Sequence, residues 1–253
     1  MIINFTSDFE DYMRHQLSVN GFKHIPFDRD LLFIHYCNIV LRRIGKLKRK
    51  IQKSIVFECP KNLTNGLRQL ETAISKGEDL LPWQSKNILN TGYDDHMCFN
   101  WGIYHLHLGE TREKDSQFMV RTGLVLYCLV DFQNIYFIQI LEHGEKHSDE
   151  LLVIARSNWP KLFPKNISNN SAEEKMLSAG KKADHLKFLL TNFEDYVREN
   201  AEKFARQIKR ISGNEISDLQ VKLEIDENTS IAYAEEIHSG VRFKLGTLPL
   251  FHT

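Results

Sequence analysis

The chain lacks several features that would assign it to a familiar class of protein. It has neither GxxxxGK[ST] nor GxGxxG, so an enzyme that cradles nucleotide phosphates in such a loop is not indicated. Its four cysteines include no CxxC pair, and Cys37 and Cys128 lie in apolar runs typical of reduced core thiols. No apolar run approaches the roughly 18 residues of a membrane span, and the N-terminus does not resemble a signal peptide. We therefore expect a soluble, cytoplasmic protein.

An excess of charge of one sign is lacking overall but present locally. The 253 residues carry 33 Lys and Arg against 33 Asp and Glu, and they are 42% hydrophobic, which is typical of folded globular chains. Residues 1–91 hold 14 basic and 9 acidic side chains, whereas residues 94–160 hold 5 and 10. A surface that binds nucleic acid is therefore expected first in the N-terminal part.

Apolar periodicity predicts an α+β fold. We expect a helical, basic region at 1–91, a central antiparallel β-meander plus a helix at 92–160, and C-terminal helices with a β-hairpin at 161–253. The central region is predicted to carry the site. The expected helices are 7–20, 28–53, 62–77, 148–160, 172–180 and 182–211, and the expected strands are 101–109, 120–130, 134–144 and two or three after residue 219.

Histidines cluster in the central region. His105 and His107 are two residues apart, so in a strand they point to the same face. His143, Lys146 and His147 follow the third central strand, and a meander could bring both groups to one sheet edge. Because imidazole titrates near neutral pH and binds metals, we expect a catalytic or substrate-binding site here. The alternative is that these histidines only form hydrogen bonds at the sheet edge.

A metal centre is the second interpretation of the same histidines. An HxH pair on one strand face supplies two nitrogens at a workable separation. His105, His107, His143 and His147 would then bind a divalent metal such as zinc, with Asp149 or Asp94 supplying an oxygen.

One segment is basic throughout. Residues 42–53 contain seven basic side chains and no acidic one, and such clusters attract phosphates by charge and counterion release. We expect a nucleic-acid-binding surface on the helix predicted there. The alternative is a solvated helix end, where cations suit the helix dipole. The basic residues are Arg42, Arg43, Lys46, Lys48, Arg49, Lys50 and Lys53.

Arg121 is expected to begin the second central strand, close to the end of the first. An arginine beside histidines could hold a phosphate through two parallel hydrogen bonds. The alternative is a salt bridge to Glu110, Glu113 or Asp115.

The segments 104–109 (YHLHLG), 121–127 (RTGLVLY) and 143–147 (HGEKH) carry a resemblance. Their order resembles the RelE/ParE-like (BECR-fold) superfamily of toxin ribonucleases, in which helices precede an antiparallel sheet with an arginine-led hairpin. The resemblance implies that Arg121 binds the scissile phosphate, that His143, Lys146 or His147 acts as an acid or stabilises charge, and that an antitoxin is a partner. The chain also resembles a bacterial family with WGIxHLHLG and NWP, which implies no activity.

Three hypotheses follow. The first, which we favour, is a metal-independent endoribonuclease of toxin or phage-defence type that needs no cofactor. In it, histidines move protons, Arg121 and Lys146 bind the phosphate, and the basic segment holds the RNA. The second is a metal-dependent hydrolase that uses the histidine cluster. The third is a non-enzymatic protein that binds nucleic acid or a partner, with structural histidines.

Overall fold

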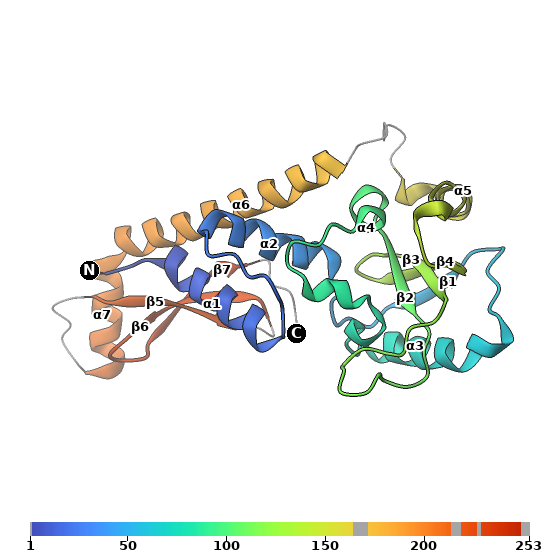
Figure 1. The fold of residues 1–253 in the computed structure, drawn as a ribbon. Helices are drawn as coiled ribbons and strands as arrows, with labels where there is room; N and C mark the ends of the chain where they lie inside the picture. The colour runs from blue at the N-terminus through green and yellow to red at the C-terminus, as the bar shows by residue number, and fades with distance from the viewer. Residues whose placement is uncertain (1, 164–171, 214–218, 227–228, 249–253) are drawn as a thin grey trace. The chain divides into compact units, whose positions relative to one another are not determined.

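The protein has the expected α+β fold (Figure 1). The computed structural model describes residues 2–163, 172–213, 219–226 and 229–248. Within them lie seven α-helices, a four-stranded sheet and a three-stranded sheet. The chain divides into two compact units, one formed by Met1–Val40 with Ser178–His252 and the other by Leu41–Leu177. The division into the three consecutive regions 1–91, 92–160 and 161–253 stays a prediction.

The first unit joins helices from both ends of the chain to an antiparallel sheet of order β5-β6-β7. The α1 helix is tied to β5, because the Asp8 carboxylate accepts a 2.8 Å hydrogen bond from the Leu223 amide. The α6 helix is tied to α2, because Lys187 lies 5.3 Å from the centre of the Phe33 ring. The elements are α1 (Phe5–Val19), α2 (Arg29–Arg42), α6 (Ala172–Glu199), α7 (Ala201–Ser212), β5 (Val221–Asp226), β6 (Ile231–Glu236) and β7 (Arg242–Thr247).

Two local expectations for this unit are wrong. The first helix begins at Phe5 and not at residue 7, because the Asn4 side chain caps it by accepting from the Ser7 amide. The long C-terminal helical region breaks at Asn200 and not near residue 181, since α6 continues through Gly180 to Glu199 and α7 begins at Ala201. The terminal strands form a three-stranded sheet, in agreement with the two or three strands expected there.

The second unit is built on a mixed sheet of order β1-β4-β3-β2. The β2, β3 and β4 strands form the expected antiparallel meander, and β1 adds to β4 in parallel. The strands are β1 (Lys50–Lys53), β2 (Ile103–His107), β3 (Leu124–Val130) and β4 (Asn134–Glu142), and the helices are α3 (Thr64–Lys76), α4 (His96–Trp101) and α5 (Ser148–Asn158). Short 3-10 turns occupy Lys61–Leu63, Leu81–Trp83, Lys86–Leu89, Glu145–His147 and Pro160–Leu162.

Helices cover both faces of this sheet, as its continuous apolar strands predicted (Figure 1). On one face Leu106 and Leu126 pack in a core with Leu70 of α3. On the other, Ile103 and Tyr127 pack in a core with Met97 of α4 and with Leu151 and Ala155 of α5. Because side chains alternate along β2, the apolar residues Leu106 and Leu108 face α3, and His105 and His107 face the opposite side.

The helix expected over 28–53 ends at Arg42, and residues 50–53 form β1 instead. The Gln84 side chain takes backbone groups that a longer helix would use, since it accepts from the Ile44 amide and donates to the Arg42 carbonyl. Arg49 then fixes the extended segment, because its guanidinium donates to the carbonyls of Gly45 and Asp131, each at 2.8 Å.

The central strands also begin later than expected. Asp95 caps the short α4 helix by accepting from the Cys98 amide, and Gly102 ends that helix with φ +67°, so β2 starts only at Ile103. The β3 strand starts at Leu124, which leaves Arg121 in the preceding loop. None of the helices within the described ranges combines the length and apolar character needed to cross a membrane.

Gly66 on α3 packs closely against the backbone of Leu108, and this packing leaves no room for a side chain. A β-carbon at this position would lie 1.9 Å from the carbonyl oxygen of Leu108, directly after the histidine strand. We expect Gly66→Ala to destabilise the protein by about 1–3 kcal/mol, since a rigid backbone must move. Gly45→Ala, which meets no atom within 4 Å, is the control. Urea unfolding measures both, and equal midpoints for the two variants would contradict the expectation.

A candidate three-histidine site

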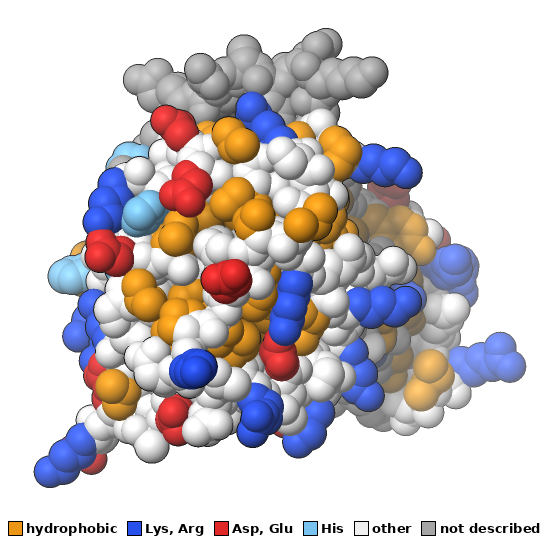
Figure 2. Space-filling model, turned by 90° about the vertical axis from the view of Figure 1, so that its right-hand side faces the viewer, with side chains coloured by type: hydrophobic (Ala, Val, Ile, Leu, Met, Phe, Trp, Pro, Cys, Tyr) orange, Lys and Arg blue, Asp and Glu red, His pale blue; other side chains and the backbone are white. Residues whose placement is uncertain are grey.

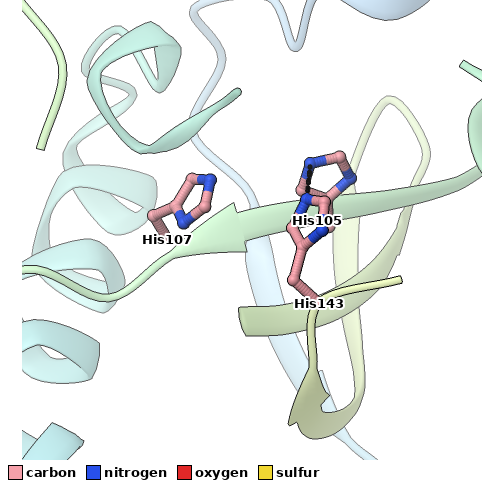
Figure 3. Close-up of side chains that lie close together, drawn as sticks. All are labelled: His105, His107 and His143. Atoms are coloured by element: carbon pink, nitrogen blue, oxygen red, sulfur yellow. Dashed lines mark hydrogen bonds between the residues drawn. The ribbon is translucent and has the colours of Figure 1, made fainter. Parts of the chain in front are cut away.

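Three of the predicted residues meet at one end of the mixed sheet (Figure 3). His105 and His107 lie on β2 opposite Tyr127 and Val125 of β3, and His143 directly follows β4. The ring of His143 lies 4.8 Å from that of His105 and 5.9 Å from that of His107, measured between centroids. The expectation that the HxH pair shares a face and meets a histidine from beyond the third strand is therefore confirmed.

The ring nitrogens of this trio converge. One nitrogen from each ring lies within 4.8 Å of the others. The Nε2 atoms of His105 and His143 are 3.3 Å apart, so one ring donates a hydrogen bond to the other, and the accepting ring is neutral (Figure 3). His107 is only 4% exposed, yet neither of its ring nitrogens has a hydrogen-bond partner within the described residues. A buried imidazole without partners is costly, and such groups are rare in folded proteins.

Two of the three imidazoles stay neutral at physiological pH. The pKa of His105 is lowered to about 4, chiefly by burial and also by the positive charge of His143 and Arg121. Burial also lowers the pKa of His107 to about 4, with added contributions from His105, Arg121 and His143. Because both groups are unprotonated near pH 7, their nitrogen lone pairs are available.

Arg121 supplies positive charge beside the trio. It is exposed and forms no ion pair within the part of the chain that the structure describes, so the expected alternative of a salt bridge to Glu110, Glu113 or Asp115 is not observed. Glu113 pairs instead with Lys86. The guanidinium lowers the pKa of both His105 and His107, which places it within electrostatic reach of the trio.

The remaining candidates in this region lie outside the trio. Lys146 pairs with Glu142, and His147 lies 3.5 Å from a carboxylate oxygen of Glu150. Asp94 lies 3.7 Å from the His96 ring. The four-histidine metal set expected from the sequence is therefore reduced to three within the described residues, because His147 ends the 3-10 turn that leads into α5 and lies outside the cluster.

A separate groove contains the last of these candidates. Asp149 lines it with Glu150 at the start of α5, beside Val56, Gln139, Val153 and Ile154. Figure 2 shows this side of the molecule, where hydrophobic side chains gather near the middle and Lys and Arg are spread around them. Asp149 is thus a groove residue and not a ligand of the trio.

Sequence reasoning missed two residues that support the trio. Asp95 lies close enough to His143 for that ring's charge to lower the carboxyl pKa, although burial raises it overall. Tyr127 lies in an apolar strand, and its hydroxyl contacts the turn that carries His143. The acidic turn 94–95 was a signal for Asp95, whereas nothing in the apolar run distinguished Tyr127.

The basic segment is divided by the structure. Arg42 and Arg43 are only 3% and 6% exposed, so the prediction that they contact nucleic acid at the surface is wrong. Arg43 pairs with Asp79, and Lys53 pairs with Glu71. Lys46, Lys48 and Lys50 are exposed and form no ion pair within the described residues. They alternate along the chain with the inward-facing Leu47, Arg49 and Ile51. We call these three residues the lysine row.

The low pKa values predict loss of stability in acid. The unfolded chain takes up a proton at each imidazole near pH 6.5, whereas His105 and His107 in the folded chain do so only near pH 4. As pH falls from 6.5 to 4, the unfolded state therefore binds more protons and stability decreases, on the order of 3 kcal/mol for His107 alone. Urea unfolding of metal-free protein at pH 7 and pH 4 measures the loss. The variant His105→Ala/His107→Ala should lose clearly less, and an equal loss would refute the assignment.

Comparison of the chain with models of protein families, with curated proteins and with solved structures finds no match in any of the three. The resemblance to toxin ribonucleases therefore stays a prediction, and the functional argument depends on the three-histidine site itself.

Proposed function

We propose that His105, His107 and His143 form the metal centre of a hydrolase that acts on phosphodiesters, with RNA as the favoured substrate. The observation that carries this proposal is the buried His107 ring, whose two nitrogens have no partner within the described residues while the other two rings converge beside it. A metal ion would satisfy one of these nitrogens and relieve the cost of burying it.

The donor set suits a borderline metal such as zinc. Imidazole nitrogens favour zinc, copper, iron or nickel over calcium and magnesium. Zinc–nitrogen bonds of about 2.0–2.1 Å in a tetrahedron place two ligand nitrogens about 3.3–3.4 Å apart. The Nε2 atoms of His105 and His143 are 3.3 Å apart, which supports this geometry. The low pKa of His105 and His107 also supports binding, since metal ligands must be unprotonated.

When bound, such a metal supplies a Lewis acid and lowers the pKa of a bound water toward neutrality. The chain's own residues supply the rest of the site. The three imidazoles leave the fourth tetrahedral position open, which is typical of catalytic zinc sites. Arg121 lies beside them with its guanidinium unpaired within the described residues, so it can bind an anionic oxygen of the substrate. This charge supports a phosphodiester as the substrate.

The metal-independent endoribonuclease is the second candidate. It is supported by the same juxtaposition of Arg121 and histidines, and by the hydrogen bond between His105 and His143. It requires an acid that is protonated at the working pH and a base that is strong enough to take a proton. A pKa of about 4 makes His105 and His107 weak bases, and the ion pair to Glu142 occupies Lys146. The geometry therefore favours the metal route.

We expect the purified protein to bind one zinc ion per chain. His143→Ala, in which the substituted side chain is exposed and removal should leave the fold intact, should lower the zinc affinity at least tenfold, and His107→Ala should do the same. His147→Ala is the matched control, because His147 lies outside the trio. Elemental analysis and calorimetric titration measure binding. Equal affinity in the His143 and His147 variants would refute the metal centre.

Activity on RNA separates the candidates. If the metal route is correct, wild-type protein degrades RNA, a chelator stops it and zinc restores it, while Arg121→Ala keeps the metal and loses turnover. Degradation that survives the chelator supports the metal-independent endoribonuclease. Intact RNA under all conditions supports the third hypothesis, a protein that binds nucleic acid or a partner without cleaving it.

The lysine row supports RNA as the ligand. Its three exposed lysines alternate with inward-facing residues along the segment that leads into β1, which would let them bind successive phosphates of a single strand. Arg49 holds this segment rigid from the inside through its bonds to backbone carbonyls. The row lies beside the start of β4, where Lys50 pairs with Asn134, whereas His143 follows the end of that strand.

Removing the row should weaken RNA binding. We expect Lys46→Glu/Lys48→Glu/Lys50→Glu, in a His143→Ala background that prevents cleavage, to lower the slope of log affinity against log salt by about 2, since three phosphate contacts are lost. Lys61→Glu/Lys114→Glu/Lys161→Glu makes the same charge change at other exposed lysines and is the control. Fluorescence anisotropy across a salt titration measures both, and identical slopes for the two variants would show that the row does not bind RNA.

Location and protein partners belong to the same proposal. None of the four cysteines forms a disulfide, which supports the cytoplasm as the working compartment. A role in phage defence or as a toxin, with an antitoxin as partner, rests on the resemblance alone.

A further inference from the structure

The hydroxyl of Tyr127 lies at the centre of the turn that carries His143. It accepts a hydrogen bond from the Gly144 amide at 3.0 Å. Its proton is shared between the carbonyls of Glu142 and Gly144, at 3.1 and 3.0 Å. The chain on both sides of His143 is therefore bound to one oxygen atom, and that oxygen belongs to a residue of the neighbouring strand.

We propose that Tyr127 is the positioning residue of the three-histidine site and that its hydroxyl sets the place of the His143 ring against His105. This inference rests on the proposed metal centre for its functional consequence, and on the hydrogen bonds for its structural one.

Sheet pairing by itself does not fix His143. The last paired residues of the β3–β4 ladder are Leu124 and Glu142, so His143 is the first residue beyond it. Its own amide donates to the Gly123 carbonyl at 3.2 Å, which holds the backbone but leaves the direction of the turn open. The bonds from Tyr127 supply that direction. Gly144 completes the turn with φ +141°, a conformation that side-chain-bearing residues rarely adopt.

The same tyrosine also faces the other side of the site. Tyr127 is the direct cross-strand partner of His105, and the two rings lie 6.4 Å apart on the same face of the sheet. Tyr127 therefore pairs with His105 across the sheet, and its hydroxyl binds the turn that carries His143. Because Tyr127 is 2% exposed and packed in the core beneath α5, its oxygen has little freedom to move. The distance between the Nε2 atoms of the two histidines is thus determined by a rigid residue.

Loss of the hydroxyl has a defined consequence. Tyr127→Phe keeps the buried ring but leaves the Gly144 amide without its partner, so the turn can change direction to find another. His143 then samples positions away from His105, and the metal site loses the preformed arrangement of two of its ligands. Removing groups that orient metal ligands lowers metal affinity by about 10- to 100-fold, and we expect that range here.

Tyr104→Phe is the matched control. Its hydroxyl also donates one hydrogen bond to a backbone carbonyl, that of Leu41 at 2.8 Å, and it neighbours His105 in sequence. It points to the opposite face of the sheet, where it packs against the core beneath α3. Both variants lose a buried tyrosine hydrogen bond, so we expect similar reductions in their unfolding midpoints. Only Tyr127→Phe should also change the histidine site.

Two measurements on the full chain test the proposal. The first is titration with Co²⁺, whose absorption reports the number of ligands: we expect 10- to 100-fold weaker binding in Tyr127→Phe and unchanged binding in Tyr104→Phe. The second is the NMR spectrum of the histidine rings in metal-free protein, where only Tyr127→Phe should shift the His143 resonances.

The outcomes separate this inference from the proposed function. Unchanged His143 resonances in Tyr127→Phe, or equal Co²⁺ affinities in the two tyrosine variants of a metal-binding protein, would overturn the positioning role. If the wild type binds no metal but Tyr127→Phe alone shifts the His143 resonances, the positioning role stands and the metal centre fails.

Discussion

The register between β2, β3 and β4 is the constraint on which the site depends. It places His105 opposite Tyr127 and ends the ladder at Glu142, so that His143 emerges beside the histidines of β2. Because side chains alternate, a slip of one residue in β2 would turn His105 and His107 toward α3 and bring Leu106 to the other face. The register is fixed by burial, since Leu106 and Leu126 pack under α3 while Ile103 and Tyr127 pack under α4 and α5.

The burial that fixes the register also decides the chemistry. An enclosed imidazole loses its proton readily, and two such rings beside Arg121 lose it more readily still. The same enclosure therefore weakens His105 and His107 as proton carriers and makes them better metal ligands. Arg121 would contribute twice, because its charge disfavours imidazolium and would attract the anionic substrate of the proposed hydrolase. An acid–base ribonuclease would need these rings to be more exposed, or paired with a carboxylate.

Sequence alone could predict the short-range part of this arrangement. The two-residue spacing gave a shared face for His105 and His107, and the apolar run ending before His143 placed that residue at a strand end. The same reasoning failed where distant residues decide. Gln84 ends the helix at Arg42 from about forty residues away, and the pairing of β1 with β4 turns a basic helix into a strand. Tyr127 could not be distinguished from other core aromatics, because its role comes from a hydroxyl whose partners lie 15 and 17 residues along the chain.

The positions of the lysine row and the trio have a consequence for how RNA would lie. Lys50 is level with Asn134 at the start of β4, and His143 follows Glu142 at its end. Nine residue steps separate Asn134 from His143, which corresponds to roughly 30 Å of strand. An RNA strand that contacts both would therefore have to run along the sheet for several nucleotides, and a shorter substrate could reach only one of them. Under the proposed function, RNA binding and hydrolysis would then be separable. A mononucleotide phosphodiester would report on the trio alone, whereas only longer RNA would depend on both.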